Sequence, residues 1–270
     1  MPKPIFQSYG FPESKSLVIC GDIHGDFNTL VNKICVENQM KDTVVIVAGD
    51  CGFGFEQKGY YDHIVKRNNK RMNDANNWIV FIRGNHDNPA YFDGRTFMHK
   101  RFMAIPDYSV VRANHHTVLC IGGAVSVDRI FRMASWQNHL EELHHSRQNS
   151  EDHEILAPNC YWKNESPTYL EDILETILLE NSIDIVVTHT APFFCELQSK
   201  SGLQLWTKVD SRLLSDIQKE RATIDAIYEA LKGQPVTHWC YGHFHQSWHS
   251  SVEGTLFKML DIMELFEIRG

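Results

Sequence analysis

Five short runs of apolar, β-branched residues recur along this chain of 270 residues, and segments with helical spacing separate them. The runs cover residues 17–20, 43–48, 78–82, 183–187 and 236–241. Apolar runs of this length, bounded by glycine and polar residues, are typical of buried strands. Their alternation with helical segments predicts βαβ units and therefore an α/β fold.

Two other stretches have the pattern of β-hairpins. One is VVRANHHTVLCIGGAVS, with its turn near Asn114, and the other is SWHSSVEGTLFKMLDIMELFEI, with Glu253 and Gly254 at the tip. Hairpins combined with βαβ units predict two sheets packed face to face, with helices outside. The segment 128–166 is polar and weakly periodic, so we expect a surface insertion or cap there. No domain boundary stands out, and we predict a single domain over residues 1–270.

Composition excludes several classes of protein. The formal net charge of −8 argues against non-specific nucleic-acid binding, which depends on clustered lysine and arginine. The seven cysteines are scattered and form no C-x-x-C pair, so they indicate neither a disulfide framework nor a zinc knuckle. The first residues, MPKPIFQSYGFPESKS, lack an apolar core, and no apolar run approaches membrane-spanning length. We therefore expect a cytoplasmic protein without a membrane partner, and the sequence leaves its oligomeric state open.

Each apolar run is followed by a short motif that contains aspartate, asparagine or histidine, in most cases next to glycine. The five runs end in G-D-I-H-G-D, G-D-C-G, R-G-N-H-D, T-H-T-A-P and G-H-F-H. The carboxyl ends of strands in an open α/β sheet share one edge, where ligands bind, so these five segments should converge on one site. The glycines among them fit the sharp turns and close backbone approach that such a site requires.

The side chains at these strand ends offer oxygen and nitrogen donors but no thiolate. Such donors suit divalent manganese, iron, zinc or magnesium. Because the candidates outnumber the ligands of one tetrahedral zinc, we favour two divalent ions that share a bridging carboxylate. Asp50, flanked by glycine and small residues, is the predicted bridge. The candidate ligands are Asp22, His24, Asp50, Asn85, His189, His243 and His245.

In its motifs and their order, the sequence resembles the calcineurin-like metallophosphoesterase superfamily, which includes protein Ser/Thr phosphatases, diadenosine tetraphosphatases and many phosphodiesterases. The motifs GDIHG, GD, RGNHD, TH and GHFH span residues 22–245. The resemblance implies a four-layer α/β/β/α sandwich of two mixed sheets with a dinuclear metal site. It implies a bridging Asp50, a first ion held by Asp22, His24 and His245, and a second held by Asn85, His189 and His243.

The resemblance also implies roles for residues around the metals. His86 matches the family's catalytic histidine, and Asp87 matches the acidic residue that supports it. We expect a water that bridges the two ions to attack phosphorus in line, while His86 protonates the leaving oxygen and Asp87 holds the imidazolium. Arg83 is expected to bind a substrate phosphate. The sequence reads G-D-C-G-F-G where protein phosphatases have G-D-x-x-D-R-G, and Arg129 and Arg132 are the candidates to replace the lost arginine.

Three functions are compatible with these motifs. The first is a phosphomonoesterase that acts on a phosphoprotein or a small phosphate ester, with manganese as the expected activating ion. The second is a phosphodiesterase or nucleotide pyrophosphatase, which the simple G-N-H-D motif and a covering insertion favour. The third is a non-catalytic binding module, which the presence of His86 and all seven candidate ligands disfavours. We rank the monoesterase first because Arg83 offers charge to a dianionic phosphate.

Overall fold

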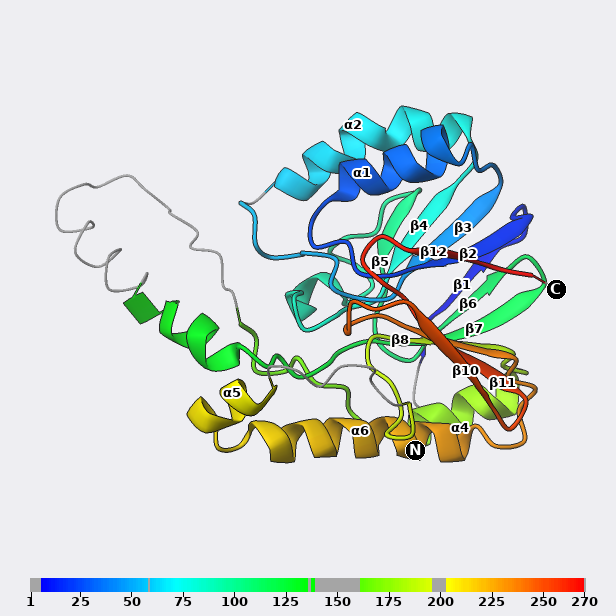
Figure 1. Cartoon of the computed structure of the whole chain (residues 1–270). Helices are drawn as coiled ribbons and strands as arrows, with labels where there is room; N and C mark the ends of the chain where they lie inside the picture. Colours follow the sequence, from blue (N-terminus) through cyan, green and yellow to red (C-terminus); the bar gives the residue numbers. More distant parts are fainter. Residues whose placement is uncertain (1–5, 58, 136, 139–160, 196–202, 270) are drawn as a thin grey trace, which may run out of the picture.

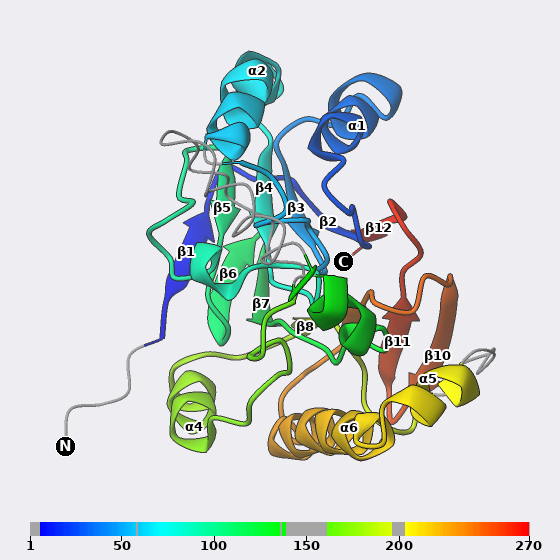
Figure 2. The same ribbon diagram turned by 90° about the vertical axis from the view of Figure 1, so that its left-hand side faces the viewer.

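Two β-sheets lie face to face between two layers of helices (Figures 1 and 2). Helices α1 (Phe27–Asn32) and α2 (Tyr60–Asp74) cover one outer face, and α4 (Glu171–Glu180) and α6 (Leu213–Ala230) cover the other. The computed structural model describes every residue except 1–5, 58, 136, 139–160, 196–202 and 270. The predicted α/β fold with two mixed sheets between helices is confirmed.

The first sheet has five strands in the order β12-β2-β3-β4-β5. Strands β2 to β5 are parallel, and β12 runs antiparallel to β2 at one edge. Side chains alternate between its faces, so Val45 and Val47 pack toward α1 and α2 while Val44 and Ile46 face the second sheet. The strands are β12 Leu265–Ile268, β2 Ser16–Cys20, β3 Thr43–Val47, β4 Trp78–Phe81 and β5 Phe102–Ala104.

The second sheet has seven strands in the order β1-β6-β7-β8-β9-β11-β10. Its two antiparallel pairs are the predicted hairpins, with Asn114 and His115 in one turn and Glu253 and Gly254 in the other, all at positive φ. This backbone suits two-residue hairpin turns because it matches the twist of the strands. The strands are β1 Ser8–Phe11, β6 Ser109–Ala113, β7 His116–Ile121, β8 Ile185–Thr188, β9 His238–Tyr241, β10 Trp248–Val252 and β11 Thr255–Met259.

Three apolar layers hold these elements together. The layer between the sheets contains Ile19 of β2 and Val187 of β8, both fully buried. The outer layers bury residues such as Leu30 of α1 under the first sheet and Ile224 of α6 under the second. Burial of this kind stabilises the fold by about 1.5–3 kcal/mol for each large apolar side chain. The strand ends are thereby held in fixed relative positions.

Shorter elements complete the described part of the chain. A π-helical segment, η1 (Lys33–Glu37), extends α1, a 3-10 turn, η2 (Pro89–Tyr91), follows β4, and α5 (Leu203–Val209) precedes α6. Residues 129–135 at the start of the predicted insertion are helical, and Phe131 there lies 5.3 Å from Trp206 of α5, ring centre to ring centre. Residues 136 and 139–160 of that segment lie outside the described residues, so a single domain with an insertion stays a prediction.

Candidate metal centre

The two sheets bring the five predicted strand ends to one common edge. In the first sheet Cys20 pairs with Val47, and Val47 pairs with Phe81, so the loops after β2, β3 and β4 begin side by side. In the second sheet Val187 pairs with Cys240, which places the ends of β8 and β9 together. These loops carry all seven candidate ligands. The site therefore lies at an edge to which both sheets contribute.

One group of ligand atoms comes from Asp22, His24, Asp50 and His245, all within 4.8 Å of one another. The Nε2 atom of His245 lies 3.0 Å from Oδ2 of Asp22 and 3.1 Å from Nε2 of His24. Both carboxylates are buried, whereas the two imidazoles are partly exposed. The group is thus closed on the carboxylate side and open to solvent on the imidazole side.

A second group comes from Asp50, His189 and His243, so Asp50 belongs to both groups. The Nε2 atom of His189 lies 3.2 Å from Oδ1 of Asp50 and 3.0 Å from Oδ1 of Asn85. The ring of His243 lies 5.0 Å from that of His189, centre to centre. The structure therefore brings together all seven residues that the motifs predicted as ligands, with Asp50 between the two groups.

The donors and their orientation fit divalent metal ions. Carboxylate oxygens, amide oxygens and imidazole nitrogens are the ligands that manganese, iron and zinc accept. Nδ1 of His189 lies 2.6 Å from the carbonyl oxygen of Ala48, which can only accept a hydrogen bond, so Nδ1 carries the proton. Nε2 faces the oxygen atoms of Asp50 and Asn85, and without its proton it would offer a lone pair to a metal ion, the arrangement usual for a metal-binding histidine.

The charges in this cluster influence one another strongly. Burial opposes ionisation of Asp50, yet the neighbouring imidazoles, His189 first, outweigh it and hold the pKa of this carboxyl well below its usual range. Burial also opposes a charge on His189, but Asp50 raises its pKa to about 9. Burial lowers the pKa of His243, and a hydrogen bond to Asp22 raises that of His245. The buried carboxylates thus favour positive charge at the centre of the cluster, which divalent cations would supply.

Four of the candidate ligands have left-handed backbone conformations. Their φ angles are 45° at His24, 46° at Asp50, 69° at His243 and 50° at His245. This conformation costs a non-glycine residue about 1–3 kcal/mol and persists only where the surrounding structure enforces it, commonly at functional sites. Gly84 allows the close approach, because a Cβ atom there would lie 2.1 Å from Oδ1 of Asp50.

His86 lies at the rim of the cluster. Its Nε2 atom is 3.9 Å from Oδ2 of Asp50, and its ring stacks on Phe55 with the centres 6.3 Å apart. Burial lowers the pKa of this imidazole to about 4, with Asp50 opposing and Arg132 adding to the decrease. A cavity of about 190 Å³ opens beside the ring, and it is lined by His24, Gly25, Gly52, Phe55, Glu56, Tyr60 and His86.

Asp87 occupies a different position from the one expected. Its fully buried carboxylate binds the backbone of the loop that carries Asp50, rather than the imidazole of His86. Burial and the nearby Asp50 charge raise its pKa to about 7. Asp87 therefore shapes the Asp50 loop, and its expected role as the partner of His86 is corrected. The donors to its carboxylate, at 2.8–2.9 Å, are the N–H groups of Cys51, Gly52, Phe53 and Gly84.

Arg83 also requires a correction. Its buried guanidinium donates two hydrogen bonds to the carboxylate of Asp107, at 2.9 and 2.7 Å. Three further bonds, of 2.7–3.1 Å, go to the backbone carbonyl oxygens of Asn164, Glu165 and Ser166. An arginine side chain has five N–H donors, and these five bonds use all of them. Arg83 therefore anchors the segment 164–166 and has no donor left for a substrate phosphate.

The two arginines proposed as substrate ligands differ in position. Arg129 is buried and donates to Asp210 at 2.5 Å and to Asp216 at 2.8 Å, which ties helix 129–135 to the start of α6. Arg132 donates to Asp128 at 2.8 Å, and one of its guanidinium nitrogens contacts both ring nitrogens of His86. Only Arg132 of this pair is seen to reach the candidate site, whereas Arg129 is corrected to a structural residue.

Two residues that the sequence analysis did not identify lie directly behind Asn85. The amide nitrogen of Asn85 donates to the hydroxyl of Ser126 at 3.0 Å, and this hydroxyl donates to Glu165 at 2.6 Å. Ser126 follows β7 in the sequence G-G-A-V-S, a sixth strand end that the same rule could have included. Glu165 gives no such signal, because it lies in a segment without periodicity and meets Ser126 only in the folded chain.

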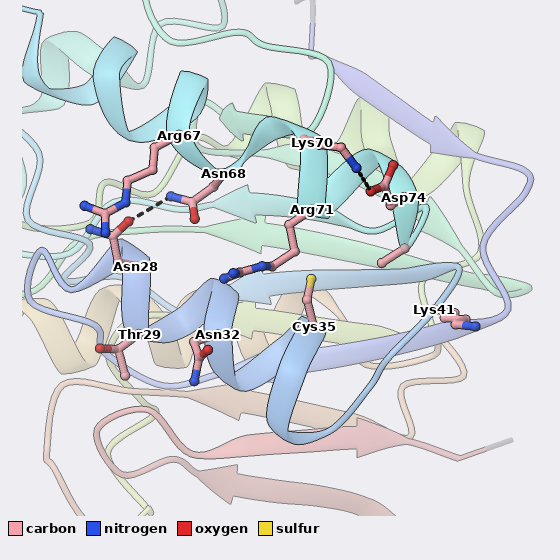
Figure 3. A pocket seen from close by; sticks show the side chains of 11 residues that line it. Asn28, Thr29, Asn32, Cys35, Lys41, Arg67, Asn68, Lys70, Arg71 and Asp74 are labelled. Atoms are coloured by element: carbon pink, nitrogen blue, oxygen red, sulfur yellow. Dashed lines mark hydrogen bonds and ion pairs between the residues drawn. The ribbon is translucent and has the colours of Figure 1, made fainter.

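A second hollow, of about 760 Å³, lies between α1 and α2 (Figure 3). Its lining is polar, and it includes Arg67, Lys70 and Arg71 of α2. Lys70 forms an exposed ion pair with Asp74, 2.6 Å apart. None of the seven candidate ligands lines this groove.

Comparison with known proteins identifies a family over most of the chain. The sequence profile of the calcineurin-like phosphoesterase family matches residues 15–247. No curated protein matches the chain significantly. None of the described helices is long and apolar enough to cross a membrane.

Several solved structures are distantly similar. A putative 5′-nucleotidase from Staphylococcus aureus in complex with alpha-ketoglutarate is 13% identical, with a TM-score of 0.46 over 93% of this chain and 50% of that one. A phosphopantetheinyl hydrolase from Mycobacterium tuberculosis is 13% identical, with a TM-score of 0.35 over 92% and 91% of the two chains. A cold-active protein-tyrosine phosphatase from Shewanella is 18% identical, with a TM-score of 0.29 over 72% and 71%. This chain spans half the length of the nucleotidase, and similarities this low carry no argument about substrate.

Proposed function

Because this chain belongs to the calcineurin-like phosphoesterase family, we propose that it hydrolyses phosphate monoesters with two divalent metal ions. The observation that carries the proposal is the meeting of two ligand groups at the buried carboxylate of Asp50. When bound, two such ions supply a polarised water and positive charge for displacement at phosphorus. Asp22, His24 and His245 would hold one ion, and Asn85, His189 and His243 the other. Manganese is the first ion to test, because all the donors are oxygen or nitrogen.

His86 is the proposed general acid for the leaving oxygen. Its ring borders the cavity beside the cluster, where a substrate phosphate would enter. With a pKa of about 4 the imidazole is neutral near pH 7, so it must gain a proton as the substrate binds. A phosphate that attracts Arg132 away from the ring would remove a positive neighbour and add negative charge, and both changes raise the pKa of His86. Substrate binding itself would thus prepare the acid.

Arg132 replaces Arg83 as the proposed phosphate ligand. It extends from helix 129–135 to His86, whereas the donors of Arg83 are all bound elsewhere. A dianionic monoester needs more cationic support than a singly charged diester, and arginine can supply two parallel hydrogen bonds. The position of Arg132 is therefore the support for ranking a monoesterase above a diesterase.

The test is steady-state hydrolysis of p-nitrophenyl phosphate and bis-p-nitrophenyl phosphate by metal-depleted protein, before and after Mn²⁺ is added. We expect the chelator to abolish activity, Mn²⁺ to restore it, and kcat/KM to be higher for the monoester. A higher kcat/KM for the diester would favour a phosphodiesterase or pyrophosphatase. Full activity in protein that elemental analysis shows to be metal-free would contradict the whole proposal. Two bound ions without hydrolysis of either ester would indicate a binding module.

A further inference from the structure

The proposed metal ligand Asn85 begins a chain of buried hydrogen bonds that leads away from the site. Its Nδ2 atom donates to Oγ of Ser126 at 3.0 Å, and Oγ of Ser126 donates to Oε2 of Glu165 at 2.6 Å. The backbone N–H of Ser126 also donates to Oε1 of Glu165, at 2.9 Å. The three residues are only 3%, 1% and 2% exposed, so solvent has little access to replace these partners.

These bonds determine which way the Asn85 amide points. When Glu165 is ionised, the hydroxyl proton of Ser126 is directed to it, so the oxygen of Ser126 can only accept from Asn85. The amide atom facing Ser126 must then be the NH₂ group, and the carbonyl oxygen must face the cluster, 3.0 Å from Nε2 of His189. Only this oxygen can coordinate a hard or borderline divalent ion. The hydrogen-bonded chain thus holds the ligand atom toward the ligand group.

Arg83 keeps Glu165 in place. It donates to the backbone oxygens on both sides of Glu165 and to that of Glu165 itself. Packing there is tight, because a Cβ atom at Gly123 would lie 2.4 Å from the Glu165 carbonyl oxygen. Arg83 and Asn85 stand two positions apart in R-G-N-H-D and reach the same segment, one directly and the other through Ser126. A shift of Glu165 would therefore break the hydrogen bonds from Arg83 and from Ser126, and so disturb the R-G-N-H-D motif that contains Asn85.

We propose that Ser126 and Glu165 are positioning residues that hold the oxygen of Asn85 toward the second metal ion. They act through Asn85. This inference rests on the proposed function, because it requires an ion in the group of Asp50, His189 and His243. Partners that orient metal ligands typically change metal affinity by roughly ten- to hundredfold when they are removed.

The experiment titrates Mn²⁺ into metal-depleted protein and measures the affinity of each site by calorimetry. Ser126→Ala should weaken one of the two sites by roughly ten- to hundredfold and leave the other nearly unchanged. Glu165→Gln, which retains the shape of the side chain, should weaken the same site to a smaller extent. The matched control is Ser109→Ala, which removes another buried hydroxyl, bonded to the Pro106 carbonyl at 2.6 Å and outside the ligand groups. It should leave both affinities within about twofold.

A double-mutant comparison separates positioning from general loosening. If Ser126 acts through Asn85, adding Ser126→Ala to Asn85→Ala should lower the affinity by less than about twofold, because coupled sites are not additive. Additive losses would overturn the inference, as would unchanged affinities in both Ser126→Ala and Glu165→Gln when the wild type binds two ions. A wild type that binds at most one ion would overturn the inference together with the dinuclear centre of the proposed function. The two failures are thus distinguishable.

Discussion

The cavity at the strand ends adjoins buried charged side chains, whereas the groove between α1 and α2 is lined by exposed ones. The cavity, of about 190 Å³, adjoins the buried carboxylates of Asp22 and Asp50, and the backbone of Asp50 is left-handed. The groove, of about 760 Å³, is lined by Arg67 and Arg71, which are exposed on the surface of α2 (Figure 3). Buried charge and enforced geometry, more than volume, therefore distinguish the candidate reaction centre.

The difference has an energetic basis. An exposed pair such as Lys70 and Asp74 gains little from its attraction, because water screens it and the side chains lose freedom. A carboxylate as deeply buried as Asp50 must be compensated by positive charge or by a metal ion. Substitutions at the strand ends should therefore have large and specific effects, whereas substitutions in the groove should have small ones.

The largest effect is expected at Asp50. Asp50→Asn keeps the shape of the side chain but removes the charge that both ligand groups share, so at least one bound metal should be lost. Turnover should be lost, because the proposed hydrolysis requires both ions. Elemental analysis and steady-state kinetics measure both, with Asp74→Asn in the groove as the control. If Asp50→Asn retains two metals per chain, Asp50 is not the bridge.

His86→Ala should come next. Loss of a general acid should lower kcat by roughly 10²–10⁴-fold while the metal content stays intact. The loss should be smaller for p-nitrophenyl phosphate than for an alkyl phosphate, because a good leaving group needs little protonation. Kinetics on both esters, with elemental analysis of the variant, provide the measurement. Equal losses on the two esters would show that His86 orients phosphate rather than donating a proton.

Substitutions of Arg132 and Arg129 distinguish a residue that binds substrate from one that only stabilises the fold. Arg132→Ala should raise KM for a monoester about tenfold or more, because it removes the guanidinium that contacts His86. Arg129→Ala should leave KM within about twofold but lower the free energy of unfolding by about 1–3 kcal/mol, because Asp210 loses its partner. Kinetics and urea unfolding of both variants distinguish the two roles. An increase in KM for Arg129→Ala equal to that for Arg132→Ala would contradict this assignment.

The buried carboxyl of Glu165 should make stability depend on pH. Burial raises its pKa from 4.5 to about 7, so the folded chain keeps this proton where the unfolded chain has lost it. A raised pKa of this kind stabilises the fold at low pH, and the gain disappears as pH rises from about 4.5 to 7. As pH rises from about 4.5 to 7, the free energy of unfolding should therefore fall by up to about 3 kcal/mol more in the wild type than in Glu165→Gln.

Urea unfolding in the presence of a chelator at pH 4.5 and pH 8 measures this difference. Glu229→Gln changes an exposed glutamate and should follow the wild-type profile. Identical profiles for the wild type and Glu165→Gln would contradict the predicted contribution of Glu165.

The smallest effect is expected in the groove. Arg67→Ala and Arg71→Ala remove exposed side chains outside the candidate site, so stability should change by no more than about 0.5 kcal/mol. Metal content should match the wild type, and kcat/KM for p-nitrophenyl phosphate should stay within about twofold. A larger loss of activity in either variant would show that the groove is coupled to the strand ends.

The sequence was sufficient to predict the fold and the convergence of the strand ends. Apolar runs and turn residues are local signals, and the rule that strand ends share an edge turns local motifs into one site. Asp22 and Asp50 could be placed in this way, because each lies in a motif that follows its strand, close to the end of β2 and of β3.

The sequence was less informative about the residues around the cluster. Arg83 and Asp87 belong to the same motif as Asn85, but their partners are a distant segment and a neighbouring loop that only the tertiary structure brings near. Arg129 and Arg132 are three positions apart on one helix, and only packing decides that one meets Asp210 and the other His86. Glu165 could not be identified, because its contact with Ser126 spans 39 residues without a local pattern.

The pairing of β12 with β2 has a consequence for the order of events during synthesis. Ser16 and Glu267 are hydrogen-bonded across 251 residues, and the carbonyl oxygen of Asp22 accepts from the backbone N–H of Met263. The loop that carries Asp22 can therefore reach its final form only after β12 has left the ribosome. Contacts so distant in sequence form slowly. We expect the nascent chain to remain unable to bind its full complement of metal until β2 and β12 have paired.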